Sequence, residues 1–298
     1  MNNPQIYRAS WHDYRSRCIY MVTFNKQQGV PSFSVLAGDW RKPVGASGSS
    51  SVVLSSIGAI IRDWILRLPQ FDSVLKVLQY VIMPDHVHIL LFVQQSTANH
   101  LGHTIARLKV AINNDSGMSE IFERGFNDQI LNPGRSLNTI YRYIRENPRR
   151  LAVRRAHPEY FRRVNNLTIG NRCFQAYGNL QLIDNPFKEQ VVVHRIDSPE
   201  TREQHRSLWL YTVANGGVLV SPFISPAEKA IRTEAEEAGG KIILITHDPM
   251  DDRYKPAGHD FDRCEAGKLL IISANQPGPL LRNTCLAMND LARTITLQ

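Results

Sequence analysis

The chain has 298 residues, 43% of them hydrophobic, which suffices for two domains with buried cores and excludes wholesale disorder. Residues 1–188 hold 23 Lys and Arg against 12 Asp and Glu, a net charge of +11. Residues 189–298 hold 12 against 15, a net charge of −3. The first part therefore has the charge of a polyanion binder, with a merely basic domain as the alternative, and the second part does not.

The N-terminal stretch lacks the apolar core of a signal peptide, and no segment approaches the roughly 20 apolar residues of a membrane span. The four cysteines are scattered and form no CxxC pair. Together these features predict a cytoplasmic protein with reduced thiols, no zinc framework and no membrane partner.

Residues 18–150 alternate between strand and helix patterns. Alternating β-formers predict a strand, apolar residues at helical spacing predict helices, and two apolar runs meet at Met83-Pro84-Asp85, where we expect a hinge between strands. The predicted elements are a strand at 18–27, a helix at 55–68, two strands within 73–93, a helix at 98–114 and a helix at 136–148 that stops near Pro148. This order is typical of an α+β domain with antiparallel pairing.

Residues 189–298 have a different hydrophobic pattern from residues 18–150. Their apolar runs are continuous, as in strands buried on both faces, and they cover residues 190–196, 216–223, 241–247 and 268–274. A helix is predicted between the second and third runs, because Ser225 can cap it and Glu228 completes a capping box. We therefore expect two domains, residues 1–185 and a small parallel α/β domain at 186–298.

Two histidines interrupt the apolar run "YVIMPDHVHILLFV" at residues 80–93. Residues two apart on a strand point the same way, so His86 and His88 present both imidazoles on one face. With a third ligand such a pair binds a divalent metal. From spacing alone, a pair of core histidines bonded to backbone carbonyls remains the alternative.

The segment "YVIMPDHVHILL" resembles the HUH motif of the single-tyrosine transposases that act on single-stranded DNA, and most of all the REP-associated tyrosine transposase branch. The likeness covers roughly residues 15–165 and includes "YMVTF", "FNDQIL" and "YIRENPRR". It implies a ferredoxin-like sheet with helices on one face. It also implies cleavage and strand transfer of single-stranded or hairpin DNA with Mg²⁺ or Mn²⁺, through a 5′-phosphotyrosine intermediate.

Two tyrosines on the 136–148 helix are candidate nucleophiles. On a helical wheel Tyr141 falls in the apolar stripe, whereas Tyr143 lies on its flank and shares a face with Asn147. The resemblance implies that Tyr143 attacks the phosphate and that Asn147 completes the metal site with His86 and His88. Tyr143 as an ordinary surface residue and Asn147 as a helix cap remain the alternatives.

Arginines crowd around and after the same helix, a residue type suited to phosphate contacts. A solvated charged helix face is the alternative interpretation. The candidate DNA-binding residues are Arg142, Arg145, Arg149, Arg150, Arg154 and Arg155.

The segment "NGGVLVSPFISPAEKAIRTEAEEAGGKIILITH" is similar to part of the Rossmann-like fold of DNA-processing protein A, a single-strand DNA loader. Ser225 could begin an anion site at the helix N-terminus, or simply cap a structural helix. Two further functions stay open for the whole chain: a non-catalytic, domesticated nucleic-acid-binding protein, and a nucleotide-binding α/β enzyme with an HUH targeting module. A homodimer is also an open expectation.

Overall fold

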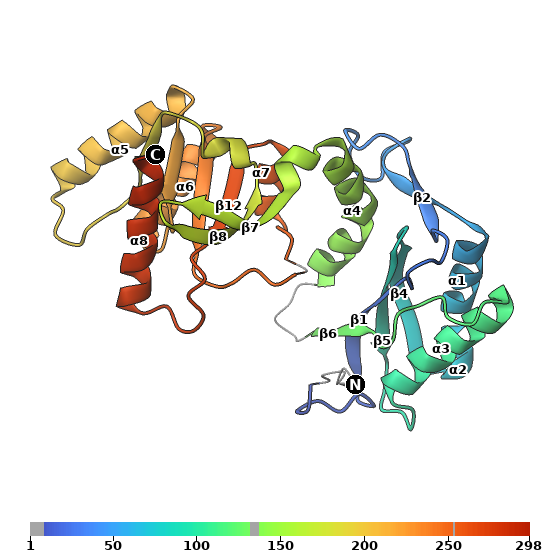
Figure 1. Ribbon diagram of the computed structural model, residues 1–298. Helices are drawn as coiled ribbons and strands as arrows, with labels where there is room; N and C mark the ends of the chain where they lie inside the picture. The colour runs from blue at the N-terminus through green and yellow to red at the C-terminus, as the bar shows by residue number, and fades with distance from the viewer. Residues whose placement is uncertain (1–8, 132–136, 253) are drawn as a thin grey trace. The chain divides into compact units, whose positions relative to one another are not determined.

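The computed structural model describes residues 9–131, 137–252 and 254–298, which form parts of two compact units, Met1–Val153 and Arg154–Gln298 (Figure 1). Each unit has its own sheet and its own buried core. Within the described ranges no helix has the length and apolar character needed to cross a membrane.

The first unit is built on a four-stranded antiparallel sheet in the order β4-β5-β1-β6, with a separate two-stranded hairpin. The sheet strands are β1 (Cys18–Asn25), β4 (Leu75–Ile82), β5 (His86–Val93) and β6 (Asn127–Leu131), and the hairpin strands are β2 (Ser34–Ala37) and β3 (Ser51–Leu54). Its helices are α1 (Ser56–Leu66), α2 (Leu68–Phe71), α3 (Leu101–Ser116) and α4 (Leu137–Ala156).

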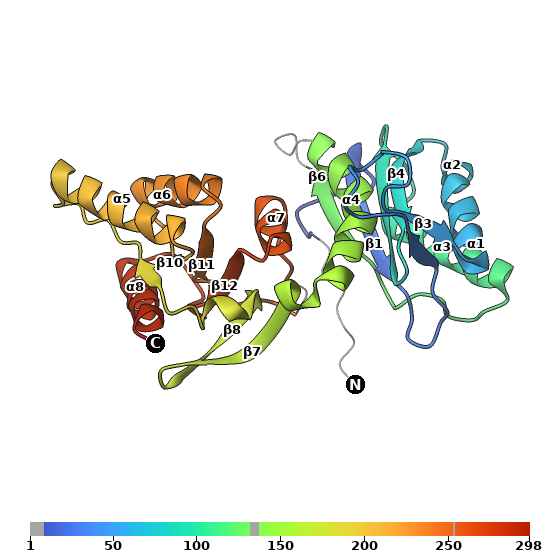
Figure 2. The ribbon, with the colours of Figure 1, turned by 90° about the horizontal axis from the view of Figure 1, so that it is seen from above.

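Helices cover both faces of this sheet, α1–α3 one face and α4 the other, as Figures 1 and 2 show. Successive side chains of β5 point to opposite faces of the sheet. Val87, Ile89 and Leu91 belong to the larger core beneath α1 and α3, whereas Leu90 packs with Ile144 of α4. His86 and His88 have the same parity as Leu90 and so belong to the α4 face.

Most predicted elements of the first unit are confirmed, but the predicted end near Pro148 is wrong, because α4 continues to Ala156. A proline inside a helix removes one backbone donor and disturbs the preceding turn. At this point the side-chain amide of Asn147 donates to the carbonyl of Tyr143 at 2.8 Å. Asn147 therefore lies within a continuous helix and caps none.

The second unit contains a six-stranded mixed sheet in the order β7-β8-β12-β11-β10-β9. The strands are β7 (Arg162–Ile169), β8 (Arg172–Gly178), β9 (Lys188–Gln190), β10 (Val218–Ser221), β11 (Lys241–Thr246) and β12 (Leu269–Ser273). The helices are α5 (Pro199–Ala214), α6 (Pro226–Glu237), α7 (His259–Glu265) and α8 (Arg282–Thr296), and two short 3₁₀ turns are η1 (Pro158–Phe161) and η2 (Leu180–Leu182). Strands β9–β12 are parallel, and β10, β11 and β12 form within three of the predicted apolar runs. The strand expected at 190–196 is wrong: the ladder with β10 is made by the preceding polar segment, Lys188–Gln190, and residues 191–196 form no strand.

The second unit begins about 30 residues earlier than the expected boundary at 185/186. The reason is strand pairing: β8 pairs antiparallel with β12, and β7 pairs with β8, so both strands extend the second sheet. The basic residues between 154 and 188 therefore belong to the second unit. With this division residues 1–153 hold 17 Lys and Arg against 10 Asp and Glu, a net charge of +7.

Candidate functional site

The two histidines lie at the start of β5, directly after the turn Met83-Pro84-Asp85. The neighbouring loop fixes this turn through backbone hydrogen bonds, from Lys26 N to Asp85 O at 2.8 Å and from Phe33 N to Pro84 O at 3.1 Å. The turn itself closes through Met83 N and His86 O at 2.8 Å. The backbone that presents the histidines is therefore held from two sides.

The side chains of His86 and His88 meet on the α4 face, as their spacing predicts. Their ring centroids are 4.7 Å apart, with an interplanar angle of 74°. Each ring is oriented through Nδ1, which lies 2.7 Å from Asp85 Oδ1 in His86 and 2.7 Å from Thr23 Oγ1 in His88. The partners are thus side chains of a carboxylate and a hydroxyl, not the backbone carbonyls of the alternative interpretation.

Burial keeps His88 neutral. His88 is 6% exposed, and desolvation, with a smaller contribution from neighbouring His86, lowers its pKa from 6.5 to about 3, while Asp85 acts weakly in the opposite direction. A neutral imidazole is the form that ligates metals. His88 is therefore ready to act as a ligand throughout the physiological pH range.

A third ring extends the pair toward α4. The centroid of Tyr143 lies 5.6 Å from that of His88, at an interplanar angle of 64°. The guanidinium carbon of Arg150, two turns further along α4, lies 5.6 Å from the centroid of the same tyrosine ring. Tyr141 and Tyr143 both pack against the core on this face, but the ring contact with His88 is made by Tyr143.

The donor set of the histidine pair fits a divalent metal. If Nδ1 of each ring carries the proton, both Nδ1 contacts are satisfied and both Nε2 lone pairs are left for a metal, since neither Nε2 has a hydrogen bond within the described residues. No group of three His, Cys, Asp or Glu side chains that could hold a metal occurs in the described ranges. A third protein ligand in this part of the chain would have to be another residue type, such as the amide of Asn147, which is 6% exposed.

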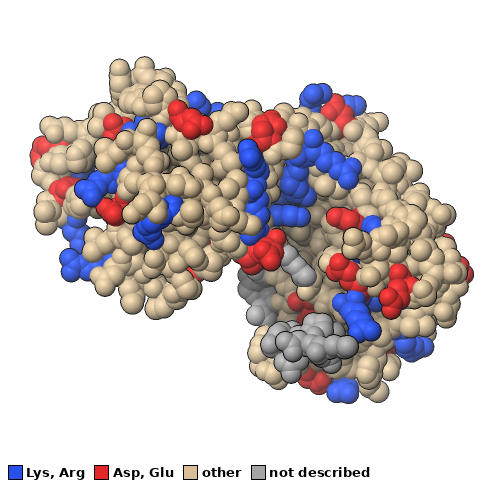
Figure 3. Space-filling model, in the orientation of Figure 1, with Lys and Arg blue, Asp and Glu red and all other residues tan. Residues whose placement is uncertain are grey.

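The candidate DNA-binding arginines differ in accessibility. Arg142, Arg145 and Arg155 are exposed, and Figure 3 shows Lys and Arg side chains gathered over α4. Arg149 donates to the carbonyl of Trp40 at 3.0 Å, and Arg150 is buried against Tyr143. The first three are placed to contact a ligand from solution, whereas Arg150 belongs to the tyrosine's immediate surroundings.

Ser225 lies at the N-terminus of α6, as predicted, where its hydroxyl accepts from Glu228 N at 3.2 Å. The buried carboxylate of Glu228 accepts the backbone N–H groups of Ile224, Ser225 and Val193. The N–H groups of Ile224, Ser225 and Glu228 at this helix end are thus engaged within the capping box, which favours the structural interpretation.

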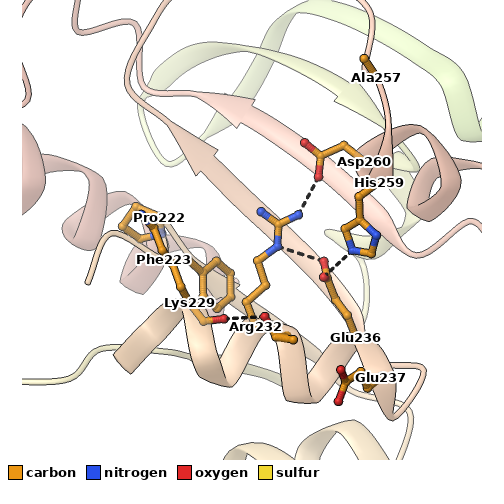
Figure 4. A pocket seen from close by; sticks show the side chains of 10 residues that line it. Pro222, Phe223, Lys229, Arg232, Glu236, Glu237, Ala257, His259 and Asp260 are labelled. Carbon is orange, nitrogen blue, oxygen red and sulfur yellow. Dashed lines mark hydrogen bonds and ion pairs between the residues drawn. The ribbon is translucent and has the colours of Figure 1, made fainter. Parts of the chain in front are cut away.

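A cavity of about 600 Å³ lies beside α6 and α7 in the second unit (Figure 4). Arg232 crosses it between Glu236, at 2.9 Å, and Asp260, at 2.6 Å, and His259 contacts Glu236 at 2.7 Å. Arg232, Glu236, Asp260 and His259 are therefore engaged with one another. Helix α7 buries Phe261 and Cys264.

Sequence reasoning missed Thr23 and Asp85, the residues that orient the two imidazoles. Asp85 was visible beside the motif, but Thr23 is 65 positions away from His88 and meets it only through the register of β1 against β5. Long-range pairing of this kind leaves no local signal in sequence.

No family model matches this chain. An uncharacterised protein of Haemophilus influenzae is 19% identical over 165 residues, an alignment that covers 47% of this chain and 86% of the relative. A solved structure of the REP-associated tyrosine transposase bound to a REP hairpin aligns with 48% of this chain and 68% of its own, with a TM-score of 0.34 and 12% identity. A likeness this distant carries no argument about function.

Proposed function

We propose that the protein cleaves and rejoins single-stranded DNA, as a transposase or nickase, through a covalent link to Tyr143. The observation that carries the proposal is the contact of the Tyr143 ring with His88, whose own ring contacts His86. A phenol beside two metal-competent imidazoles is a suitable arrangement for attack on a phosphodiester. Exposed arginines on the same helix suit a polyanionic substrate.

The fold supports the same proposal. The order β4-β5-β1-β6, reached in the sequence β-α-β-β-α-β once the β2–β3 hairpin is set aside, is what a ferredoxin-like HUH domain would have. In the second unit, parallel strands joined by helices are compatible with a Rossmann-like domain. We assign it no separate activity, because Arg232 in its cavity is engaged by Glu236 and Asp260.

In the proposed reaction Tyr143 is the nucleophile, and the histidine pair would hold the metal. The Tyr143 oxygen attacks phosphorus, its phenolic proton passes to solvent, the P–O3′ bond breaks, and the 3′ oxygen takes up a proton. The 5′ phosphate stays on Tyr143, so a later attack by a 3′ hydroxyl restores the phosphodiester without an energy source. His86 and His88, with Asn147 as the proposed third ligand, would hold Mg²⁺ or Mn²⁺, which supplies charge stabilisation at the phosphate.

The test uses a labelled library of hairpin and single-stranded oligonucleotides with Mg²⁺ or Mn²⁺, resolved on a denaturing gel. Wild type should form a covalent adduct, and Tyr143→Phe should form none while it still binds DNA, because the change removes one hydroxyl. Tyr141→Phe is the matched control and should retain the adduct. If Tyr143→Phe forms the adduct and Tyr141→Phe does not, the nucleophile is Tyr141. If the wild-type protein forms no adduct under any condition, the proposal of DNA cleavage is overturned.

A further inference from the structure

A second feature of the first unit is an apolar groove on the outer side of α1, α2 and α3. Its cavity measures about 400 Å³ and is lined by Trp64, Phe71, Ala106, Arg107 and Val110, among others. The rings of Trp64 and Phe71 stack with their centroids 5.9 Å apart and an interplanar angle of 25°. The helices that carry it cover the sheet face opposite the one with His86 and His88, so the groove is separate from that site.

Two arginines border the aromatic rings. Arg67 lies over Trp64 at 5.1 Å, and Arg107 lies over Phe71 at 4.8 Å, measured from guanidinium carbon to ring centroid. Both are exposed, and in the part of the chain that the structure describes neither forms an ion pair. At the edge of the ring pair, the carboxylate of Asp115 accepts a hydrogen bond from the indole N–H of Trp64 at 3.0 Å.

We infer that this groove binds an unpaired base of a single-stranded nucleic acid. The occupant must combine a flat apolar face, which suits the walls, with negative charge, which suits Arg67 and Arg107. A nucleotide meets both conditions, because its base stacks on aromatic rings and its phosphate accepts from arginine. An apolar peptide would satisfy the walls but leave two cations without a counter-charge.

This inference does not rest on the cleavage chemistry, so it is tested in EDTA on the full chain carrying Tyr143→Phe. Fluorescence anisotropy compares an oligothymidine with an abasic strand of equal length. The unaltered groove should prefer the thymidine strand, and Phe71→Leu should reduce this preference about 10-fold, because stacking on one aromatic ring is lost. Arg107→Gln should lower the slope of log affinity against log salt by about 0.7, the loss of one phosphate contact.

Arg282→Gln in the second unit is the matched control for a lost charge and should leave the preference and the salt slope unchanged. Circular dichroism checks the fold of Phe71→Leu, and exposed Arg107 provides a test that does not depend on that variant. The inference is overturned if no preference for bases exists, if Phe71→Leu leaves it intact, or if Arg282→Gln changes the slope as much as Arg107→Gln. It is also overturned if Phe71→Leu dissociates an oligomer while DNA binding stays the same, since the groove would then be a protein interface.

Discussion

Replacing Thr23 by Val should weaken both the stability of the first unit and its affinity for a metal. The hydroxyl lies 2.7 Å from Nδ1 of His88, which is 6% exposed. Valine keeps the branched shape and suits a strand, so the change removes the polar partner without opening a cavity. The buried Nδ1 then lacks a partner, which costs about 1–3 kcal/mol of unfolding free energy.

Urea denaturation of the metal-free protein in EDTA measures the change in the free energy of unfolding. Calorimetry with Mn²⁺ measures the change in metal affinity. Loss of a group that orients a ligand imidazole should weaken binding about 10- to 100-fold. Thr23→Ser keeps the hydroxyl and should preserve the Mn²⁺ affinity. If Thr23→Val unfolds at the same urea concentration as wild type and binds Mn²⁺ equally well, the hydroxyl does not hold the ring and the reasoning fails.

Three further outcomes follow from the described contacts. Because burial lowers the folded-state pKa of His88 to about 3 from 6.5, the unfolded chain binds a proton that the folded chain does not. In EDTA the contribution of neutral His88 to the free energy of unfolding is therefore complete above about pH 6.5. Between pH 6.5 and pH 3 the free energy of unfolding falls by up to about 1.4 kcal/mol per pH unit, and denaturation of His88→Asn should not show this slope. Gly58→Ala should destabilise the first unit by about 3 kcal/mol in denaturant, since its Cβ would lie 2.0 Å from the carbonyl oxygen of Phe33. Glu228→Ala should cost about 2–4 kcal/mol because three backbone N–H groups lose their acceptor, whereas exposed Glu237→Ala in the same helix should change the midpoint little.

The sequence predicted those parts of the site that depend on local periodicity. The period of two along β5 sufficed to place His86 and His88 together. The helical wheel placed Tyr141 in the apolar stripe and Tyr143 on its flank, whereas both rings are partly buried against the same core and only Tyr143 has a ring contact with His88 among the described residues. Whether Tyr143 is the nucleophile and Asn147 a ligand stays a prediction.

Features that depend on pairing between distant segments were not predictable. Strand β8 joins a sheet whose partner strand, β12, begins about 90 residues later, so the domain boundary was expected too late. The short, half-exposed β6 has too little apolar character to indicate a strand. Pro148 indicated a helix end, but α4 packs against the sheet through Ile140 and Ile144 and continues, since tertiary packing outweighs a local breaker.

The turn before β5 is fastened to its surroundings by main-chain groups of Lys26 and Phe33. Every amino acid except proline supplies the same N–H donor, so these two hydrogen bonds depend on the path of the loop and not on the side chains of Lys26 and Phe33. The loop and the sheet therefore contribute differently to the site. The loop contributes through the path of its backbone, and the sheet contributes through the side chains of a few residues. If the proposed function holds, a change in metal preference would call for changes in the sheet residues, while the loop that presents them keeps its path.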